Sequence, residues 1–484
     1  MYKRQVLRAW RLPLHLQLPL TPAAWHPALL QSRVAAGELV LSYTAAASSC
    51  NAMQTLPDVH SLTLRLRPST RAGTLNDVAL AHRLCSALAS LRTLRTLKLE
   101  YCSESTSIEL LTCAPELSRL SQLVHLDLRH CKIDDNAAAA LEPGLGRLTS
   151  LTFLDLRNMD GGAAFRALVP ALSWLPQLAH LDLGDNDLRD ADVVALASPL
   201  SGLVSLTFLD LSSGDSDYNV RALSPVLSRL SHLAHLHLGR VSIYVDGAAE
   251  LALALGCLPS LSFLGLSETY YEFSHIEALA PALGGLVSLT FLQLSDNYLH
   301  SRGARALAPA LGRLLQLAHL DLSCNRLDHG SAAALAPALG RLTALTFLDL
   351  AMFRDDADLL APALSRLSRL AHLNLNWVSL SDHTAVALAS PLSHLTALTT
   401  LRLGCGHMRD SDVAALAPAL ARLSRLESLD LSSNHIGDGS IPHLKLALER
   451  LTSLREVDLA VTLFSDAGAA QLRAGCPPGV CFHH

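Results

Sequence analysis

Leucine recurs along this chain in the pattern L-x-x-L-x-L-x-x-N, in which apolar and polar positions alternate. The clearest copy runs from Leu289 to Asn297. Alternation over so few residues predicts a short β-strand with one buried face. The fourth position of the pattern recurs about every 28 residues, with one step of 25 before Leu373, at Leu97, Leu126, Leu154, Leu181, Leu209, Leu236, Leu264, Leu292, Leu320, Leu348, Leu373, Leu401, Leu429 and Val457.

Each predicted strand is followed by a segment rich in Ala and Leu, most often Ala-Leu-Ala-Pro-Ala-Leu-x-Arg-Leu, as at residues 306–314. The spacing of its leucines predicts a helix that faces the strands. Proline lies inside this segment at positions 115, 143, 170, 199, 225, 281, 309, 337, 362, 391 and 418. A proline in a helix interior costs about 3 kcal/mol. We therefore expect the segment that returns the chain from one strand to the next, here called the return, to be broken. It should contain a turn and then a second short helix that starts near the proline.

The loop between strand and helix carries two further signals. Side chains that could accept hydrogen bonds from free helix-start amides stand at Asp135, Asp190, Ser331, Asp382, Asp410, Asp438 and Asp466. The ninth position of the pattern is asparagine only at Asn186, Asn297, Asn325 and Asn434. A buried asparagine there satisfies backbone groups of the loop, so we expect irregular loops in the copies that lack it.

A fixed period of 20 to 29 residues with this pattern resembles the leucine-rich repeat. The residue before the fourth-position leucine alternates between His and Phe from His125 to His372, with one break in phase between Phe263 and Phe291. The larger unit is therefore a pair of repeats, about 56 residues long. Here the chain resembles the ribonuclease-inhibitor-like subfamily over roughly residues 90–470. The resemblance implies an α/β solenoid, a horseshoe with a concave parallel β-sheet and short helices on the convex side.

Four segments are expected. Residues 1–55 form an atypical N-terminal leader or cap, 56–93 a degenerate first repeat, 94–470 about 14 copies of the repeat, and 471–484 a C-terminal capping tail. Because residues 1–37 contain no acidic residue and five basic ones, organelle targeting is an alternative role for that stretch.

Composition narrows the function classes. A net charge of −5 argues against a general nucleic-acid binder. The uncharged runs at 278–295 and 383–401 contain Pro, Gly or polar residues and stay in register with the repeat, so we do not read them as membrane spans. Ten scattered cysteines and the absence of an N-x-S/T sequon favour the cytoplasm. A monomer is expected.

No phosphate-binding loop, H-E-x-x-H helix, nucleophile elbow or cysteine pair at ligand spacing occurs in the sequence. The alternating histidines lie two strands apart, about 10 Å, which is too far to share a metal ion. We therefore expect no enzyme, cofactor or metal, and a protein-binding scaffold instead. The resembled subfamily leaves two alternatives open, a substrate-receptor or sensor subunit and a Ran-type GTPase activator, although the acidic tail of the latter is missing here.

The predicted binding site is the concave face, where the third, fifth and seventh pattern positions point to solvent. Its third-position residues are Phe153, Phe208, Phe263, Phe291, Phe347, His180 and His235, and its fifth-position residues are Asp127, Asp155, Asp182, Asp210, Asp321 and Asp349. Neighbouring aspartates repel by roughly 1 kcal/mol per pair, a cost that a basic partner relieves. We expect a protein or peptide partner with a basic surface, with affinity modulated near pH 6 by His180 or His235. Aspartate after leucine is, however, common in this repeat type, and duplication copies residues regardless of use.

Overall fold

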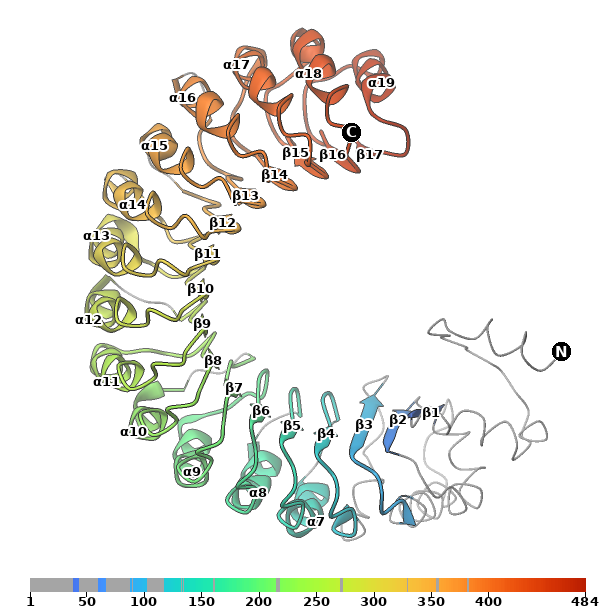
Figure 1. The fold of residues 1–484 in the computed structure, drawn as a ribbon, viewed down its shortest axis with the longest axis vertical. Helices are drawn as coiled ribbons and strands as arrows, with labels where there is room; N and C mark the ends of the chain where they lie inside the picture. Colours follow the sequence, from blue (N-terminus) through green and yellow to red (C-terminus); the bar gives the residue numbers. More distant parts are fainter. Residues whose placement is uncertain are drawn as a thin grey trace, which may run out of the picture.

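The computed structural model describes residues 38–42, 60–66, 88, 90–101, 117–131, 133, 135–159, 162–214, 218–269, 273–328, 330–353, 357–380 and 383–484. These residues form an open, curved solenoid with strands along the inside of the curve and helices along the outside (Figure 1). This arrangement confirms the predicted horseshoe with a concave parallel sheet and convex helices.

The strands follow one another across a single sheet, and each pairs in parallel with the next. In the described residues they are β1 (Glu38–Ser42), β2 (Ser61–Leu66), β3 (Thr96–Tyr101), β4 (His125–Asp127), β5 (Phe153–Asp155), β6 (His180–Asp182), β7 (Phe208–Asp210), β8 (His235–His237), β9 (Phe263–Gly265), β10 (Phe291–Gln293), β11 (His319–Asp321), β12 (Phe347–Asp349), β13 (His372–Asn374), β14 (Thr400–Arg402), β15 (Ser428–Asp430), β16 (Glu456–Asp458) and β17 (Cys481–His483). Residues at the same pattern position lie opposite each other on neighbouring strands, as Leu264, Leu292 and Leu320 do. Each pattern position therefore forms a column that runs along the sheet.

The returns on the convex side are mostly single helices. They are α7 (Asp135–Leu145), α8 (Gly162–Leu172), α9 (Asp190–Leu200), α10 (Ser224–Leu227), α11 (Val245–Leu255), α12 (Phe273–Leu283), α13 (His300–Leu311), α14 (Ser331–Leu339), α15 (Ala361–Leu364), α16 (His383–Leu392), α17 (Asp410–Leu420), α18 (Ile441–Leu448) and α19 (Asp466–Gly475). Short 3-10 turns, η3 (Val220–Leu223), η4 (Ala357–Leu360) and η5 (Asp438–Ser440), directly precede α10, α15 and α18.

The predicted break at proline is wrong for most returns. Proline lies inside a continuous helix in α7, α8, α9, α12, α13, α14, α16 and α17. At Pro225 and Pro362, and also at Pro442 in α18, a 3-10 turn precedes a new helix, and Pro115 lies outside the described residues. The helices tolerate proline because it falls in the last turn. The carbonyl that loses its donor belongs to an exposed residue, Arg166 in α8 and Arg305 in α13, where water can hydrogen-bond to it.

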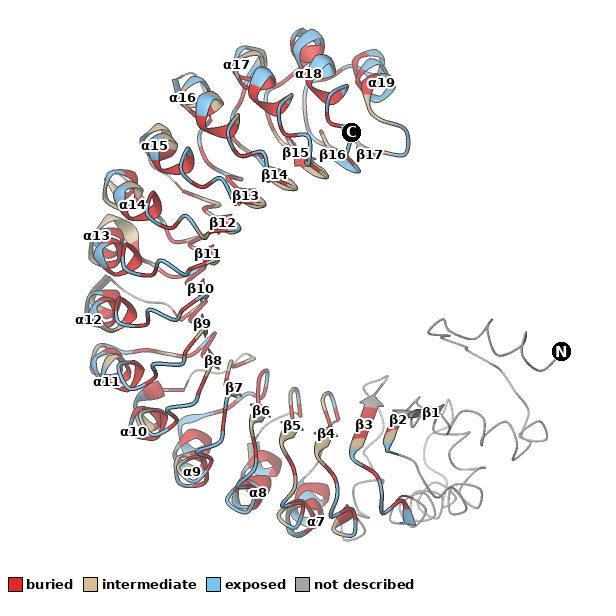
Figure 2. Cartoon of the chain, viewed as in Figure 1, coloured by how far each residue is buried: buried red, intermediate tan, exposed pale blue. Residues whose placement is uncertain are grey.

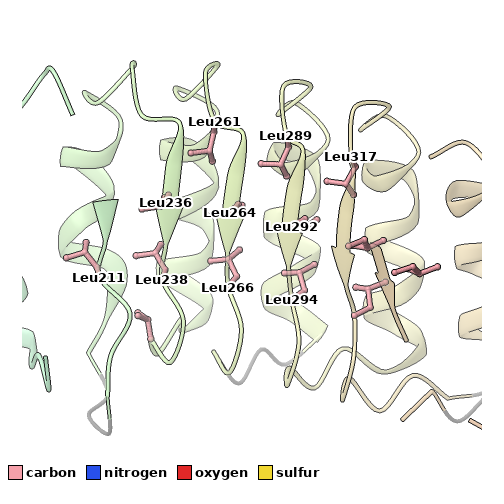
Figure 3. Close-up of a cluster of buried hydrophobic side chains, with 14 of the residues drawn as sticks. Leu211, Leu236, Leu238, Leu261, Leu264, Leu266, Leu289, Leu292, Leu294 and Leu317 are labelled. Atoms are coloured by element: carbon pink, nitrogen blue, oxygen red, sulfur yellow. The ribbon is translucent and has the colours of Figure 1, made fainter. Parts of the chain in front are cut away.

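Leucines from the strands and helices fill the space between the two layers. In Figure 3 the labelled leucines of neighbouring repeats form rows, such as Leu238, Leu266 and Leu294, that continue from one strand to the next. Leu236, Leu264 and most of their equivalents are completely buried. In Figure 2, buried residues follow the strands and the inward sides of the helices. Burying one leucine contributes roughly 1.5–3 kcal/mol, so the repeated core is the main source of stability.

The loops after the strands are regular, which differs from our expectation. Each asparagine in the ninth position bridges two repeats: Asn297 Nδ2 donates to the carbonyl oxygens of Leu266 (2.8 Å) and Leu294 (2.9 Å). Where asparagine is missing, other groups act, and the Tyr218 hydroxyl donates to the Leu211 carbonyl at 2.5 Å. The eighth position is left-handed in copies with and without asparagine, at His130, Asn158, Asp185, Arg240, Glu268, Asp296, Cys324, Met352, Trp377, Cys405, Ser433 and Val461.

Three of the predicted N-cap side chains, those of Asp190, Asp410 and Asp438, hydrogen-bond to the neighbouring repeat. Asp190 is the first residue of α9, and its Oδ1 accepts a hydrogen bond from Asn219 N at 2.7 Å. Asp410 does the same for the next repeat in α17. Asp382 lies outside the described residues. These side chains therefore tie successive loops together.

Candidate functional site

The third-position side chains of the concave face form one continuous stack of rings from β4 to β13. Adjacent ring centroids are 3.7–4.3 Å apart and adjacent planes differ by 6–21°. The stack contains His125, Phe153, His180, Phe208, His235, Phe263, Phe291, His319, Phe347 and His372. The in-register parallel pairing produces it, because each ring stands directly beside its equivalent on the next strand.

Stacking changes what these rings offer a partner. Phe153, Phe208 and Phe263 were expected to be exposed, but they are only half-buried, since each covers its neighbour's face. Ring edges, not faces, are therefore available on the concave side. Each stacked pair contributes roughly 0.5–1.5 kcal/mol beyond burial, so the stack also stabilises the sheet.

The histidines in the stack are neutral at physiological pH. Burial lowers the pKa of His180, His235 and His319 to about 4. The pKa of His125 and His372 is also lowered, again mainly by burial. The expectation that His180 or His235 switches near pH 6 is therefore wrong, because the charged imidazolium would have to form between two stacked rings.

The first four aspartates of the fifth-position column are buried, contrary to the prediction that they point freely to solvent. Arg129 pairs with Asp127 (Nη2–Oδ2 2.6 Å) and reaches Asp155 on the next strand (Nε–Oδ2 3.4 Å). Arg157 repeats this one strand later, joining Asp155 (3.0 Å) to Asp182 (3.1 Å). The arginines occupy the seventh position and lie over the carboxylates. They provide within the chain the positive charge that we had assigned to a partner.

This cover ends at β6, because the seventh position there is Gly184. Burial raises the pKa of Asp182 to about 7, and the charges of Asp210 and Asp155 add to the rise. Burial also raises the pKa of Asp210, but hydrogen bonds from His237 and Ser212 outweigh it and lower that pKa overall. His237 Nδ1 lies 3.1 Å from Asp210 Oδ2.

The His237 ring fits because two neighbouring residues have no side chain. A Cβ added at Gly265 would lie 2.9 Å from His237 Nε2, and one added at Gly239 would lie 3.0 Å from the same atom. The sequence shows His237 and Gly265 simply as two gaps in the aspartate column. The structure makes them one unit, in which the histidine of β8 lies over the glycine of β9.

The carboxylates of the C-terminal half of the column are more accessible. Asp321 and Asp349 are register partners on β11 and β12, and both are half-buried. Asp321 Oδ1 accepts hydrogen bonds from Ser323 N (3.0 Å) and Oγ (2.7 Å). Asp349 Oδ2 accepts one from Asn374 Nδ2 at 2.8 Å. Burial, the largest cause, raises the pKa of Asp349, and the charge of Asp321 raises it further. In the described residues neither aspartate has an arginine or lysine ion pair of the kind that covers Asp155.

Sequence reasoning found the two columns but missed Arg129 and Arg157. The signal was present, since arginine stands two residues after aspartate in two consecutive copies. Elsewhere on the described surface, no group of three or more His, Cys, Asp or Glu side chains is arranged to hold a metal ion. In the same part of the chain no helix combines the length and apolar character that crossing a bilayer requires.

Comparison with known proteins supports the repeat assignment. The family model described as Leucine Rich repeat matches residues 121–141, 177–197, 286–308 and 424–441, so the chain contains leucine-rich repeats. The chain is also similar to "Capping protein, Arp2/3 and myosin-I linker protein 3" of Rattus norvegicus, Mus musculus and Homo sapiens. Each is 38% identical over 79 residues, which are 16% of this chain and 6% of the relative. The match therefore spans a small part of these longer proteins.

Three solved structures also align with the chain over most of its length. A leucine-rich-repeat protein of Leptospira interrogans has a TM-score of 0.46 at 16% identity, covering 90% of this chain and 92% of that one. An internalin of Listeria monocytogenes has a TM-score of 0.39 at 18% identity, covering 97% and 98%. The Rad7 and Elc1 complex of yeast has a TM-score of 0.45 at 16% identity, covering 84% and 92%.

Proposed function

We propose that this protein is a non-catalytic scaffold whose concave face binds a protein or peptide. One observation carries the proposal. A rigid, half-buried ring stack runs along ten consecutive strands beside two accessible carboxylates, Asp321 and Asp349, which have no covering arginine among the described residues. A rigid apolar strip beside unneutralised charge suits a partner that brings both apolar and cationic side chains.

Within this proposal the predicted site residues take different roles. Phe291 and Phe347 supply apolar edges close to Asp321 and Asp349, and partner lysines or arginines dock on those two carboxylates. Three of the other predicted aromatics, Phe153, Phe208 and Phe263, with His180 and His235, continue the strip. The buried aspartates Asp127, Asp155, Asp182 and Asp210 shape the surface through their arginine and histidine neighbours. The partner is a protein rather than a nucleic acid or a membrane, and the scaffold is a cytoplasmic monomer.

We also assign the repeats to the ribonuclease-inhibitor-like subfamily. Two observations support this assignment. Many returns are single helices of about 11 residues, such as α8 and α17, and the repeats are paired by their alternating Phe and His residues.

The test compares charge reversal on the two faces. Asp321→Lys with Asp349→Lys changes the concave face. Arg313→Glu with Arg341→Glu is the control, since these arginines line the convex grooves between α12, α13 and α14. Tagged wild-type and variant proteins are used for affinity purification with quantitative mass spectrometry, at low and high salt. We expect a partner that is lost with the concave variant, retained with the convex variant and weakened by salt. A partner retained by the concave variant and lost with the convex variant would place the site on the helices.

A further inference from the structure

Two sulfur atoms from different repeats lie in contact on the loops that follow β11 and β12. Cys324 Sγ donates to Met352 Sδ at 3.5 Å. The two residues hold the eighth pattern position of consecutive repeats, 28 residues apart. Both side chains are half-buried, so small ions can reach them from solvent. The pair lies at the loop edge of the solenoid, away from the ring stack.

The backbone holds these side chains in a fixed relation. Cys324 and Met352 are both left-handed, with φ of 57° and 61°. The Cys324 amide donates to the Ala351 carbonyl at 2.9 Å, and the Met352 amide donates to the Asn376 carbonyl at 2.8 Å. Because each residue is bonded in the same way to the next repeat, the register of the sheet sets the separation of the two sulfurs. The pair is therefore preorganised and needs no loop closure to bring its atoms together.

The donor set selects one class of metal ion. Thiolate and thioether are soft ligands that favour Cu(I) over Mg²⁺, Ca²⁺ and Mn²⁺. A structural zinc site needs four nitrogen, sulfur or oxygen ligands, and only two sulfurs meet here. Metal–sulfur bonds are about 2.3 Å long, so two sulfurs at 3.5 Å can both bind one ion in a bent arrangement, with a solvent ligand completing the coordination.

The Cys324 thiol keeps its proton until a metal ion binds. Asp296 holds the eighth position of the repeat that precedes Cys324. Burial, and then the charge of Asp296, raises the pKa of Cys324 to about 11. The thiol is therefore protonated in the free protein, and a metal ion must displace that proton.

We propose that Cys324 Sγ and Met352 Sδ bind a soft monovalent metal ion of the Cu(I) class. On binding, the S–H bond breaks and a Cys324 sulfur–metal bond forms, while one proton is released to solvent. Met352 donates a lone pair, and the oxidation state of the ion does not change. This site is independent of the proposed protein-binding face.

The chain contains a closely matched control at Cys405. Cys405 also holds the eighth position, and its φ is 55°. Its side chain is half-buried, and its amide donates to the Ser432 carbonyl at 2.9 Å. Its eighth-position neighbours are Trp377 and Ser433, so no thioether stands beside it. Comparing Cys324→Ser with Cys405→Ser therefore separates a two-sulfur site from simple reactivity of a loop cysteine.

The full chain is titrated anaerobically with Cu(I) in competition with the chromophoric chelator bicinchoninate. Wild-type protein should bind one Cu(I) that Cys324→Ser does not, and Cys405→Ser should behave as wild type. Met352→Leu keeps the volume and removes the thioether, so it should weaken this binding at least about tenfold. Circular dichroism checks that each variant is folded. The proposal is overturned if Met352→Leu binds Cu(I) as tightly as wild type, or if the two cysteine variants lose binding equally.

Discussion

The guanidinium group of Arg157 lies between the carboxylates of Asp155 and Asp182, which belong to consecutive strands. Its Nη2 is 3.0 Å from Asp155 Oδ2, and its Nε is 3.1 Å from Asp182 Oδ2. One side chain thus neutralises two buried acids and links two repeats, so the pair of contacts contributes to stability as well as to surface charge.

Arg157→Met should destabilise the solenoid, because it leaves the buried Asp182 carboxylate without a cation and Asp155 with Arg129 alone. Breaking a buried pair costs about 3–5 kcal/mol, and 35% exposure of the Arg157 side chain reduces this to about 2 kcal/mol. Urea unfolding followed by circular dichroism measures the change. Arg221→Met is the control, since Arg221 pairs with Glu250 at the surface and should cost less than about 1 kcal/mol. Equal effects of the two substitutions would show that the carboxylates do not need Arg157.

Acidification should destabilise the protein between pH 6.5 and about 4. Burial lowers the folded-state pKa of His180, His235 and His319 to about 4, whereas an unfolded histidine titrates near 6.5. In this window the unfolded chain binds more protons, so the free energy of unfolding falls as the pH falls. The pKa of Asp182 is raised to about 7, so this carboxyl group binds its proton in the folded state and stabilises the protein as the pH falls. It takes up one proton, whereas the three histidines together account for three in the unfolded chain. Urea midpoints at pH 7, 5.5 and 4.5 measure the balance.

His235→Phe should reduce this pH dependence and keep the fold. A Phe–Phe step already exists in the stack at Phe263 and Phe291, with centroids 4.3 Å apart. The substitution removes one of the three titrating groups, so the slope of stability against pH should fall by at most about 1.4 kcal/mol per pH unit. His443→Phe is the control, because that histidine lies in α18 outside the stack. An unchanged slope in His235→Phe would contradict the assigned role of the stack.

Val461→Asn should stabilise the protein by about 1 kcal/mol. Val461 has φ of 60° and is 80% exposed, so a β-branched residue adopts a left-handed conformation without burying its side chain. Asparagine tolerates that conformation far better. Val194→Asn, at an exposed position inside α9, should be nearly neutral because the two residues have similar helix propensities. Thermal unfolding distinguishes the two variants. A loss of stability in Val461→Asn would show that the left-handed conformation of Val461 is not strained.

Gly265→Ala should destabilise the protein by about 1–3 kcal/mol, because the added methyl group overlaps the His237 ring. If that overlap is the cause, removing the ring should remove the cost. In a double-mutant cycle with His237→Ala, the effects should therefore be strongly non-additive. Additive effects would indicate that the methyl group meets something other than His237.

The sequence by itself determined the period, the strand centres and the columns. Leucines such as Leu264 and Leu292 must be buried, and a fixed step between them permits only parallel strands in register. The Phe/His alternation, its break at Phe263 and Phe291, and the hydrogen bonding of Asn297 follow from the same periodicity. These features depend on one repeat and its neighbour, which is the range that a periodic sequence specifies.

The tertiary structure decided how side chains of neighbouring columns interact. Three features depend on side-chain distances of about 3–4 Å within and between adjacent strands. Arg157 covers Asp155, His237 lies over Gly265, and stacking makes the histidines neutral. A sequence pattern gives the column of each residue but not the direction in which a long side chain turns. The proline positions show the same limit, because Pro309 lies inside a continuous helix whereas Pro362, at the equivalent place in its repeat, begins a new helix after a 3-10 turn.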